Sequence, residues 1–514
     1  MVLQITPTTA MKLSLVGEQN RTFTEEELGI IRQNQLAAEE NFRRVRTEIK
    51  DQKEQLYGQI EGLQHQLLVL ENQEDNLDDK IKGYSTAFSP HNKLPPEILR
   101  HIFKCCVHEK QVEVIPITYK GGAYTISHVC SAWRRIALET PELWTGVSLQ
   151  LTKENEKQIR VARQWLSRAR TLPRSIFIKQ VSLECDGWGN NIILNLVAHY
   201  TLRSLELTLP GNQLKQLKGL LDRSLSTLEV LRLQCFSKDI EILPLPFRPA
   251  DTLSKMNVLV LDGNWDLHNL TAVGSWSRIA RLNIKPTISV QLCFVILQQC
   301  SQIELCTLHV QNTDAVSTVP DIMLPQIYYF CFYTGGVTTR MLVDAVTAPR
   351  LRSLSFRQML SQTSSDVDNT AFCQMIERSQ GLKYLTTFNV GPTSEPLDPL
   401  PLLEKLPHLE TTEIYNGILD EDAINRIALG KVGSKLKKMV FKSRHDANEI
   451  LRMVEVRQQN ASLNSYCPLA KVSPFTEITF NCVSVPSSLK NDLISRKNAL
   501  KSSYGNITIN LTFN

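Results

Sequence analysis

The hexapeptides LRSLEL (202–207) and LEVLRL (228–233) share the pattern apolar-x-x-apolar-x-apolar. Because alternate side chains of a strand point to the same face, this pattern predicts a short strand with one buried face and a preceding turn. It occurs fourteen times after residue 143, mostly at intervals of 22 to 31 residues. The starting residues are Trp144, Pro173, Leu202, Leu228, Met256, Ile279, Leu305, Ile327, Leu351, Leu382, Leu409, Leu436, Phe475 and Tyr504. Such a period predicts an array of similar units, each packed on its neighbours.

The array resembles the leucine-rich repeat, whose unit of roughly 20 to 29 residues stacks parallel strands along the inside of a horseshoe. The asparagine ladder of that family is mostly absent, although Asn264 after LVLDG is one candidate. An unrelated α/β fold that mimics some of these steps is the alternative. The resemblance implies an α/β fold, a leucine-rich-repeat-like solenoid over residues 146–514, with an extended concave surface that binds partners.

An acidic heptad segment precedes the array. Residues 21–83 contain nine Lys/Arg and fourteen Asp/Glu, and apolar residues recur every seven positions at Phe42, Ile49, Leu56, Leu63, Leu70 and Leu77. A second set, four residues after each, is only half apolar: Arg46, Lys53, Ile60, Leu67, Glu74 and Ile81. The pattern predicts a flexible tail over residues 1–22 and a long coiled-coil helix over residues 23–83. Gly83 and the following YSTAFSPHNK are expected to end this helix.

The seam of this helix has two interpretations. It pairs with a second copy or another partner, or the helix folds back on its own chain. Gly58 and Gly62 weaken the pattern, since each costs about 1 kcal/mol relative to Ala in a helix interior.

A second helical region begins at LPPEILRHIF (94–103). Proline suits the first helical turn, and Glu97 there meets the positive end of the helix dipole. Leu94, Ile98, Leu99, Ile102 and Phe103 gather on one face. An insert with a Gly121-Gly122 turn follows over residues 107–125, and then ISHVCSAWRRIALETPELW (126–144) predicts a helical segment that ends near Pro141.

These two segments resemble the F-box. The shared signature is Leu-Pro-x-Glu-Ile-Leu-x-x-Ile-Phe, then Val-Cys-x-x-Trp-Arg, then Leu-Trp, here Leu94 to Phe103, Val129 to Arg134 and Leu143-Trp144. The preceding heptads, the form LETPELW and the downstream WLSRARTLPRSIFI (165–178) further resemble F-box-like proteins of mushroom-forming fungi. The insert lengthens the gap between the two helical segments beyond the compact form of the family.

The resemblance implies an F-box over residues 84–145 that docks on the Skp-type adaptor of a cullin ubiquitin ligase, while the repeats hold a protein substrate. The residues carried over to the adaptor contact, or to the packing behind it, are Leu94, Pro95, Ile98, Leu99, Ile102, Phe103, Val129 and Trp133. The alternative is that all of these form the core of a helical cap. The resemblance thus implies a non-catalytic substrate-recognition subunit, and the competing hypothesis is a scaffold outside any ligase.

Other features argue against enzymes, membranes and nucleic acids. No Walker loop, nucleophile elbow or HExxH motif occurs, so we expect no catalytic residues, metal or cofactor. The net charge of +5 over 514 residues gives little reason to expect nucleic acid. Twelve cysteines without a CxxC pair, and no signal peptide or membrane-length apolar run, favour the cytoplasm or nucleus.

Overall fold

The computed structural model describes residues 23–88, 93–108, 113–115, 122–151, 155–180, 191–217, 227–235, 242–245, 255–267, 276–311, 318–334, 336–358, 367–463, 472–482, 487–505 and 507–513. The chain divides into two compact units, Met1–Pro95 and Pro96–Asn514. The predicted α/β class is confirmed, with a long N-terminal helix followed in sequence by a long parallel sheet. The predicted tail over residues 1–22 lies outside the described residues.

The N-terminal unit is one helix, α2 (Glu25–Ala87), of 63 residues. Its start is a capping box, in which the Glu27 N–H donates to Thr24 Oγ1 (3.4 Å) and the Thr24 N–H donates to Glu27 Oε2 (3.2 Å). The helix ends four residues after Gly83, inside the segment expected to terminate it. The six seam residues from Phe42 to Leu77 are all between 49% and 65% exposed.

The second unit is built around a sheet of 15 strands in which every neighbouring pair is parallel. Apart from the short β9, β11 pair, the strands follow one another in sequence order across the sheet. The strands are β1 (Glu113–Ile115), β2 (Gly146–Leu151), β3 (Arg174–Gln180), β4 (Leu202–Leu209), β5 (Val230–Cys235), β6 (Val258–Asp262), β7 (Arg281–Ser289), β8 (Leu305–Gln311), β9 (Ile322–Met323), β10 (Tyr329–Thr334), β11 (Val346–Thr347), β12 (Ser353–Gln358), β13 (Thr387–Val390), β14 (Thr411–Ile414), β15 (Lys438–His445), β16 (Glu477–Cys482) and β17 (Thr508–Phe513).

The repeated hexapeptides correspond to strands β2 to β8, β10 and β12 to β17, and twelve of the fourteen begin within two residues of a strand. Two predicted starts are wrong. Leu382 ends the 3₁₀ turn η6 (Gln380–Leu382), and the pattern resumes at the buried Leu385, before β13. Tyr504 is the last residue of helix α17, and the buried Ile507 leads into β17. At both positions a glycine with positive φ, Gly381 or Gly505, forms a turn before the strand.

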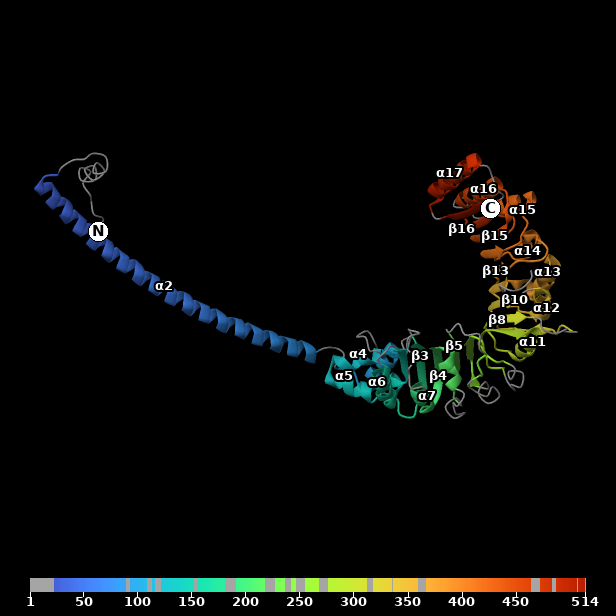
Figure 1. Cartoon of the computed structure of the whole chain (residues 1–514), viewed down its shortest axis with the longest axis horizontal. Helices are drawn as coiled ribbons and strands as arrows, with labels where there is room; N and C mark the ends of the chain where they lie inside the picture. Colours follow the sequence, from blue (N-terminus) through green and yellow to red (C-terminus); the bar gives the residue numbers. More distant parts are fainter. Residues whose placement is uncertain are drawn as a thin grey trace. The chain divides into compact units, whose positions relative to one another are not determined.

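Helices connect most of the strands. They are α6 (Asn155–Ser167), α7 (Asn191–Ala198), α8 (Gly211–Gln216), α11 (Val290–Gln299), α12 (Val337–Ala345), α13 (Asn369–Arg378), α14 (Pro399–Lys405), α15 (Glu421–Ala428), α16 (Ala447–Leu463) and α17 (Ser487–Tyr504). Figure 1 shows α12, α13 and α14 on one side of this part of the molecule and β10 and β13 on the other. Aspartates cap several of them, as where Asp420 Oδ1 accepts from the Ala423 N–H at 2.7 Å.

The hydrophobic core of the second unit runs along the sheet from one strand-helix repeat to the next. Phe332 stacks on Phe356 with ring centroids 5.6 Å apart, and Phe372 of α13 contacts both Phe356 (5.9 Å) and Phe388 (5.3 Å). Along strands such as β2 and β3 every second residue is buried, while the residues between them are half-buried or exposed. One face of the sheet is therefore packed and the other is open.

Candidate protein-docking surfaces

Four short elements form a helical head beside the first strands: α3 (Pro96–His108), α4 (Gly122–Val129), α5 (Ser131–Leu138) and the 3₁₀ helix η2 (Pro141–Trp144). Pro96 is the first residue of α3 and Glu97 lies in its first turn, as the sequence predicts. Helix α3 packs against α4, α5 and η2. Within the insert, β1 pairs with β2 in parallel and is one end of the sheet, a strand that the sequence analysis missed.

The segment predicted as one helix from Ile126 is two helices. Cys130 interrupts it with extended backbone (φ −156°, ψ 171°), and its Sγ accepts from the Trp133 N–H at 3.4 Å. Cys130 is therefore the N-cap of α5, a position in which its side chain replaces a missing helical hydrogen bond. The apolar spacing continues across this break, so the periodicity alone did not reveal it.

The head has an aromatic core. Leu99 and Phe103 of α3 point inward and are 6% and 1% exposed, and the Phe103 ring lies 4.8 Å from that of Trp133. Trp144 is fully buried, and its indole N–H donates to the Ala137 carbonyl at 2.8 Å. The side chains of Ile126, Ile136 and Leu143 are also buried in this region.

Trp144 also fastens the head to the first helix of the array. Its ring meets that of Trp165 in α6 edge-on, with centroids 4.6 Å apart. The Arg168 guanidinium lies 4.5 Å from the Trp144 ring centre, and burial lowers the pKa of Arg168. These contacts are suited to hold the head rigidly on the sheet.

The outer surface of the head retains apolar side chains. Ile98 and Ile102, one helical turn apart on α3, are 48% and 39% exposed, and Val129 at the end of α4 is 53% exposed. Two ion pairs join α3 to residues that follow α5: Lys104 Nζ with Glu142 Oε1 at 2.5 Å, and Arg100 with Glu139 at 3.7 Å. Exposed apolar groups with charged pairs beside them are typical of a protein interface.

The head also matches a known family. A family model described as F-box-like covers residues 91–150. The chain carries an F-box-like domain. No curated protein matches the chain. The F-box-like domain contains all four helices of the head and most of β2, and it overlaps the predicted bounds of 84–145.

The eight residues predicted for adaptor contact fall into three groups by their exposure. Pro95, Ile98, Ile102 and Val129 are exposed, and Leu94 and Trp133 are half-buried. Leu99 and Phe103 lie in the core, so they can act only as the packing behind the surface. Further exposed residues were not predicted, among them Leu138 on α5 and Cys105, which lies seven residues after Ile98 on α3. The seven-residue spacing is a signal that could have identified Cys105.

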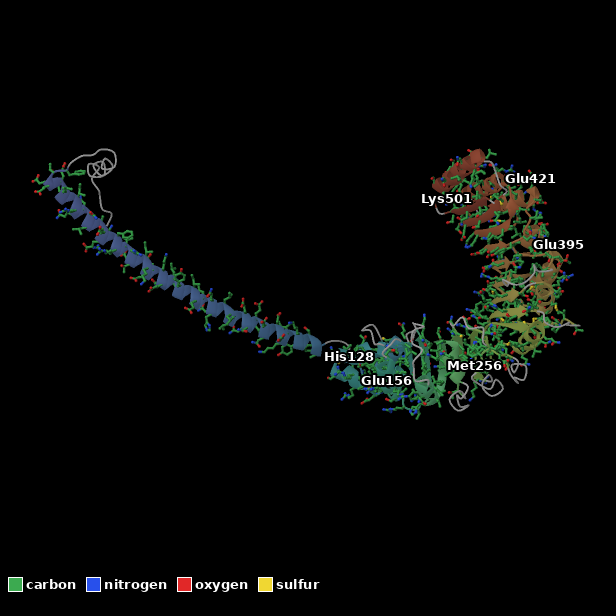
Figure 2. All side chains as sticks on the ribbon, viewed as in Figure 1. His128, Glu156, Met256, Glu395, Glu421 and Lys501 are labelled. Carbon is green, nitrogen blue, oxygen red and sulfur yellow. The ribbon has the colours of Figure 1, made fainter. Side chains whose placement is uncertain are left out.

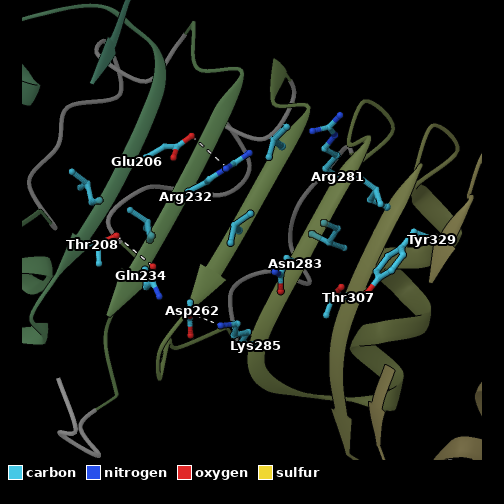
Figure 3. Close-up of a pocket in the computed structure, with 16 residues that line it drawn as sticks. Glu206, Thr208, Arg232, Gln234, Asp262, Arg281, Asn283, Lys285, Thr307 and Tyr329 are labelled. Carbon is cyan, nitrogen blue, oxygen red and sulfur yellow. Dashed lines mark hydrogen bonds and ion pairs between the residues drawn. The ribbon is translucent and has the colours of Figure 1, made fainter. Parts of the chain in front are cut away.

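The open face of the sheet carries a second candidate surface, which the sequence could not locate. A groove of about 550 Å³ lies across β4 to β8 and β10. Figure 3 shows the residues that line it. Its side chains form rows because the parallel strands pair in register, so that Glu206 lies beside Arg232, and Asn283 beside Thr307. The labelled polar lining residues are Glu206, Thr208, Arg232, Gln234, Asp262, Arg281, Asn283, Lys285, Thr307 and Tyr329.

Charge in this groove is mostly paired. Arg232 Nε lies 3.4 Å from Glu206 Oε1, and Lys285 Nζ lies 2.6 Å from Asp262 Oδ2. Burial raises the pKa of Glu206, and the Arg232 charge opposes that shift. Among the described residues, Asn283 Oδ1 is buried without a hydrogen-bond partner. An unpaired amide oxygen beside ion pairs is suited to accept a hydrogen bond from a bound polar segment.

A smaller groove of about 260 Å³ lies farther along the same face, between β10 and the end of β14. It is lined by Tyr333, Arg357, Asn389, Glu413 and Tyr415 among others. Beside it, His309 stacks on Tyr333 with ring centroids 4.2 Å apart, and burial lowers the pKa of His309. Aromatic rings next to arginine are frequent in protein-binding surfaces.

No catalytic or metal centre is apparent in the described part of the chain. There, no three His, Cys, Asp or Glu side chains are placed to hold a metal ion. Nor is any described helix long and apolar enough to cross a membrane. The two surfaces, on the head and on the open face, are those for which the geometry indicates a binding role.

Proposed function

We propose that this chain is the substrate-recognition subunit of an SCF-type cullin ubiquitin ligase. Its F-box-like domain binds a Skp-type adaptor, and its repeats bind the protein that the ligase modifies. The observation that carries the proposal is the outward-facing pair Ile98 and Ile102 within a region that matches the F-box-like family. F-box domains are protein-interaction modules that act without catalysis.

Helix α3 supports the adaptor contact because it is apolar on two sides. Leu99 and Phe103 fill the core, so the head does not need Ile98 and Ile102 to complete it. Leaving such side chains in water is unfavourable by roughly 1.5–3 kcal/mol for each fully exposed one. A partner that covers Ile98, Ile102 and Val129 removes this cost.

In this proposal the strand-helix array is a leucine-rich-repeat-like solenoid, a horseshoe whose open face holds the substrate. The parallel strands, their regular sequence period and the two grooves support this assignment. The receptor then accelerates ubiquitin transfer by proximity, since it holds the substrate in the same assembly as the conjugating enzyme. We place it in the cytoplasm or nucleus, because twelve cysteines without a CxxC pair suit a reducing compartment.

The test is co-purification of the full chain with a Skp-type adaptor. The variant Ile98→Asp with Ile102→Asp introduces two charges into the exposed face of α3 and is expected to abolish binding. Leu489→Asp with Ile494→Asp is the matched control, because these residues are exposed apolar side chains on α17. Failure of the folded, unaltered chain to bind the adaptor would exclude the proposal.

A scaffold outside any ligase is the second candidate, and the exposed heptad seam of α2 favours it. In that case the double Asp variant on α3 leaves every interaction of the chain intact. Binding partners recovered equally by the variant and the unaltered chain would support the scaffold.

A further inference from the structure

The charges of α2 are distributed unequally between its two halves. Residues 42–60 contain five Lys/Arg and three Asp/Glu, whereas residues 63–81 contain one Lys and five Asp/Glu. Figure 2 shows the side chains of α2 as sticks along the helix. We propose that α2 pairs with α2 of a second copy of this chain as an antiparallel coiled coil, centred between Glu61 and Gly62.

Apolar seam residues define the core of this pair. If residue i of one helix faces residue 123 − i of the other, the two heptad sets meet in alternating layers. Three layers are fully apolar: Phe42 with Ile81, Leu56 with Leu67, and Ile60 with Leu63. By symmetry each layer occurs twice, so the centre of the dimer, from residue 56 to 67, has an uninterrupted apolar core.

The charged members of the seam favour the antiparallel direction. In a parallel, in-register dimer Arg46, Lys53 and Glu74 would each face the same residue of the second copy, which places like charges together in the core. In the antiparallel pair each faces an apolar residue instead, and Glu74 lies one layer away from both Arg46 and Lys53 of the second copy. Opposite charges on neighbouring layers are attractive, whereas like charges in one layer are repulsive.

The residues that flank the seam support the same direction. One flank consists of the residues immediately after each member of the first heptad set. It contains the basic Arg43 and Lys50 and, three and four heptads after Lys50, the acidic Glu71 and Asp78. In an antiparallel pair this flank lies along the same flank of the second copy, so that Lys50 lies near Glu71. The other flank is largely neutral, with Gln52, Gln59, Gln66 and Gln73. A parallel dimer would place the charged flank against these glutamines.

Side chains in α2 are available for this pairing. The acidic Glu71, Glu74 and Asp78 have no ion-pair partner within the described residues. Lys50 and Arg43 have only weak contacts one turn away, with Glu54 at 3.7 Å and Glu39 at 3.9 Å, and all four side chains are exposed. Such i, i+4 pairs are readily exchanged for intermolecular ones.

The test begins with zero-length carbodiimide crosslinking of the full chain, using a mixture of ¹⁵N-labelled and unlabelled protein. We expect mixed-isotope crosslinks that join Lys50 to Glu71 and Lys53 to Glu74. Each pair is 21 residues apart, about 31 Å along one helix, so it cannot form within a single copy. Crosslinks only between nearly equal positions, such as Lys53 with Glu54, would establish a parallel dimer and overturn the proposal.

Charge exchange provides an independent test by sedimentation equilibrium of the full chain. Glu71→Lys with Glu74→Lys should raise the dimer dissociation constant about tenfold or more. Adding Lys50→Glu and Lys53→Glu exchanges the charges between the two halves of α2 and should restore dimerisation of the antiparallel pair. In a parallel pair the same four changes would leave like charges facing each other and would not restore it. The control Asp75→Lys with Asp79→Lys makes the same charge change outside the seam and its charged flank, and should have little effect.

Two further results would overturn the proposal. The unaltered chain could sediment as a monomer at all concentrations, or its α2 lysines could crosslink only to residues 96–514 of the same copy. The first outcome would show that α2 does not pair with a second copy. The second would show that α2 packs against its own chain. Adaptor binding is measured in the same samples and is expected to be unchanged, so this inference and the ligase proposal fail independently.

Discussion

Removal of the two exposed isoleucines should separate adaptor binding from folding. Ile98 and Ile102 are 48% and 39% exposed. Complete burial of an isoleucine side chain is worth about 1.5–3 kcal/mol, so covering both exposed fractions contributes about 2 kcal/mol to binding. Ile98→Ala with Ile102→Ala should therefore weaken adaptor binding roughly thirtyfold. Isothermal titration calorimetry of the full chain with a Skp-type adaptor measures this change directly.

The inward side of the same helix supplies the contrast. Phe103 is 1% exposed and lies against Trp133, so Phe103→Ala leaves a cavity in the head. The expected loss of stability is about 3–5 kcal/mol, compared with about 1 kcal/mol for each isoleucine variant. Hydrogen exchange of α3 and α5 distinguishes local opening of the head from unfolding of the whole array.

Two outcomes would refute this reasoning. An unchanged dissociation constant in the double isoleucine variant would mean that the exposed face of α3 does not contact the adaptor. A loss of protection in that variant as large as in Phe103→Ala would mean that the isoleucines belong to the core of the head.

Three further predictions concern the array. Arg457 is fully buried and donates to five backbone carbonyls, of which Ile427, Gly433 and Ser434 also accept backbone N–H groups. Arg457→Met should therefore lower the free energy of unfolding by about 4 kcal/mol, as measured by urea titration. Asp420→Ala removes the cap of α15 and should cost about 1 kcal/mol, with faster hydrogen exchange in that helix. Burial lowers the pKa of His445 below its ordinary value, so the unfolded chain binds the proton more readily and stability should fall as the pH drops through about 6.5. His445→Gln should reduce this slope in urea titrations at several pH values.

Much of the array could be predicted because its information is local. Three apolar residues in each hexapeptide determine which side of a strand is buried, and this held for twelve strands. At Leu382 and Tyr504 the apolar pattern begins five and four residues before the strand, and a glycine with positive φ lies next to each predicted start. The position of such a turn depends on backbone geometry, and the spacing of apolar residues does not predict it.

The two candidate surfaces differ in how far they could be foreseen. The region of the F-box-like domain could be predicted from LPPEILRHIF and VCSAWRR. The start of each helix and the spacing of its apolar residues depend on only a few neighbouring positions. The groove on the open face could not be foreseen, because Glu206 and Arg232 belong to different repeats and are 26 residues apart in the sequence. They meet only because β4 and β5 pair in register.

The sequence by itself determined the period of the strands, the helix start at Pro96 and the heptad seam of α2, because each depends on the spacing of side chains along one element. Only the tertiary structure decided which apolar residues of α3 remain exposed. Ile98 and Leu99 are both apolar and only about 100° apart on the helix, so either could have faced the core. Packing against Trp133 turns Phe103, and Leu99 with it, inward, and thereby leaves Ile98 and Ile102 at the surface.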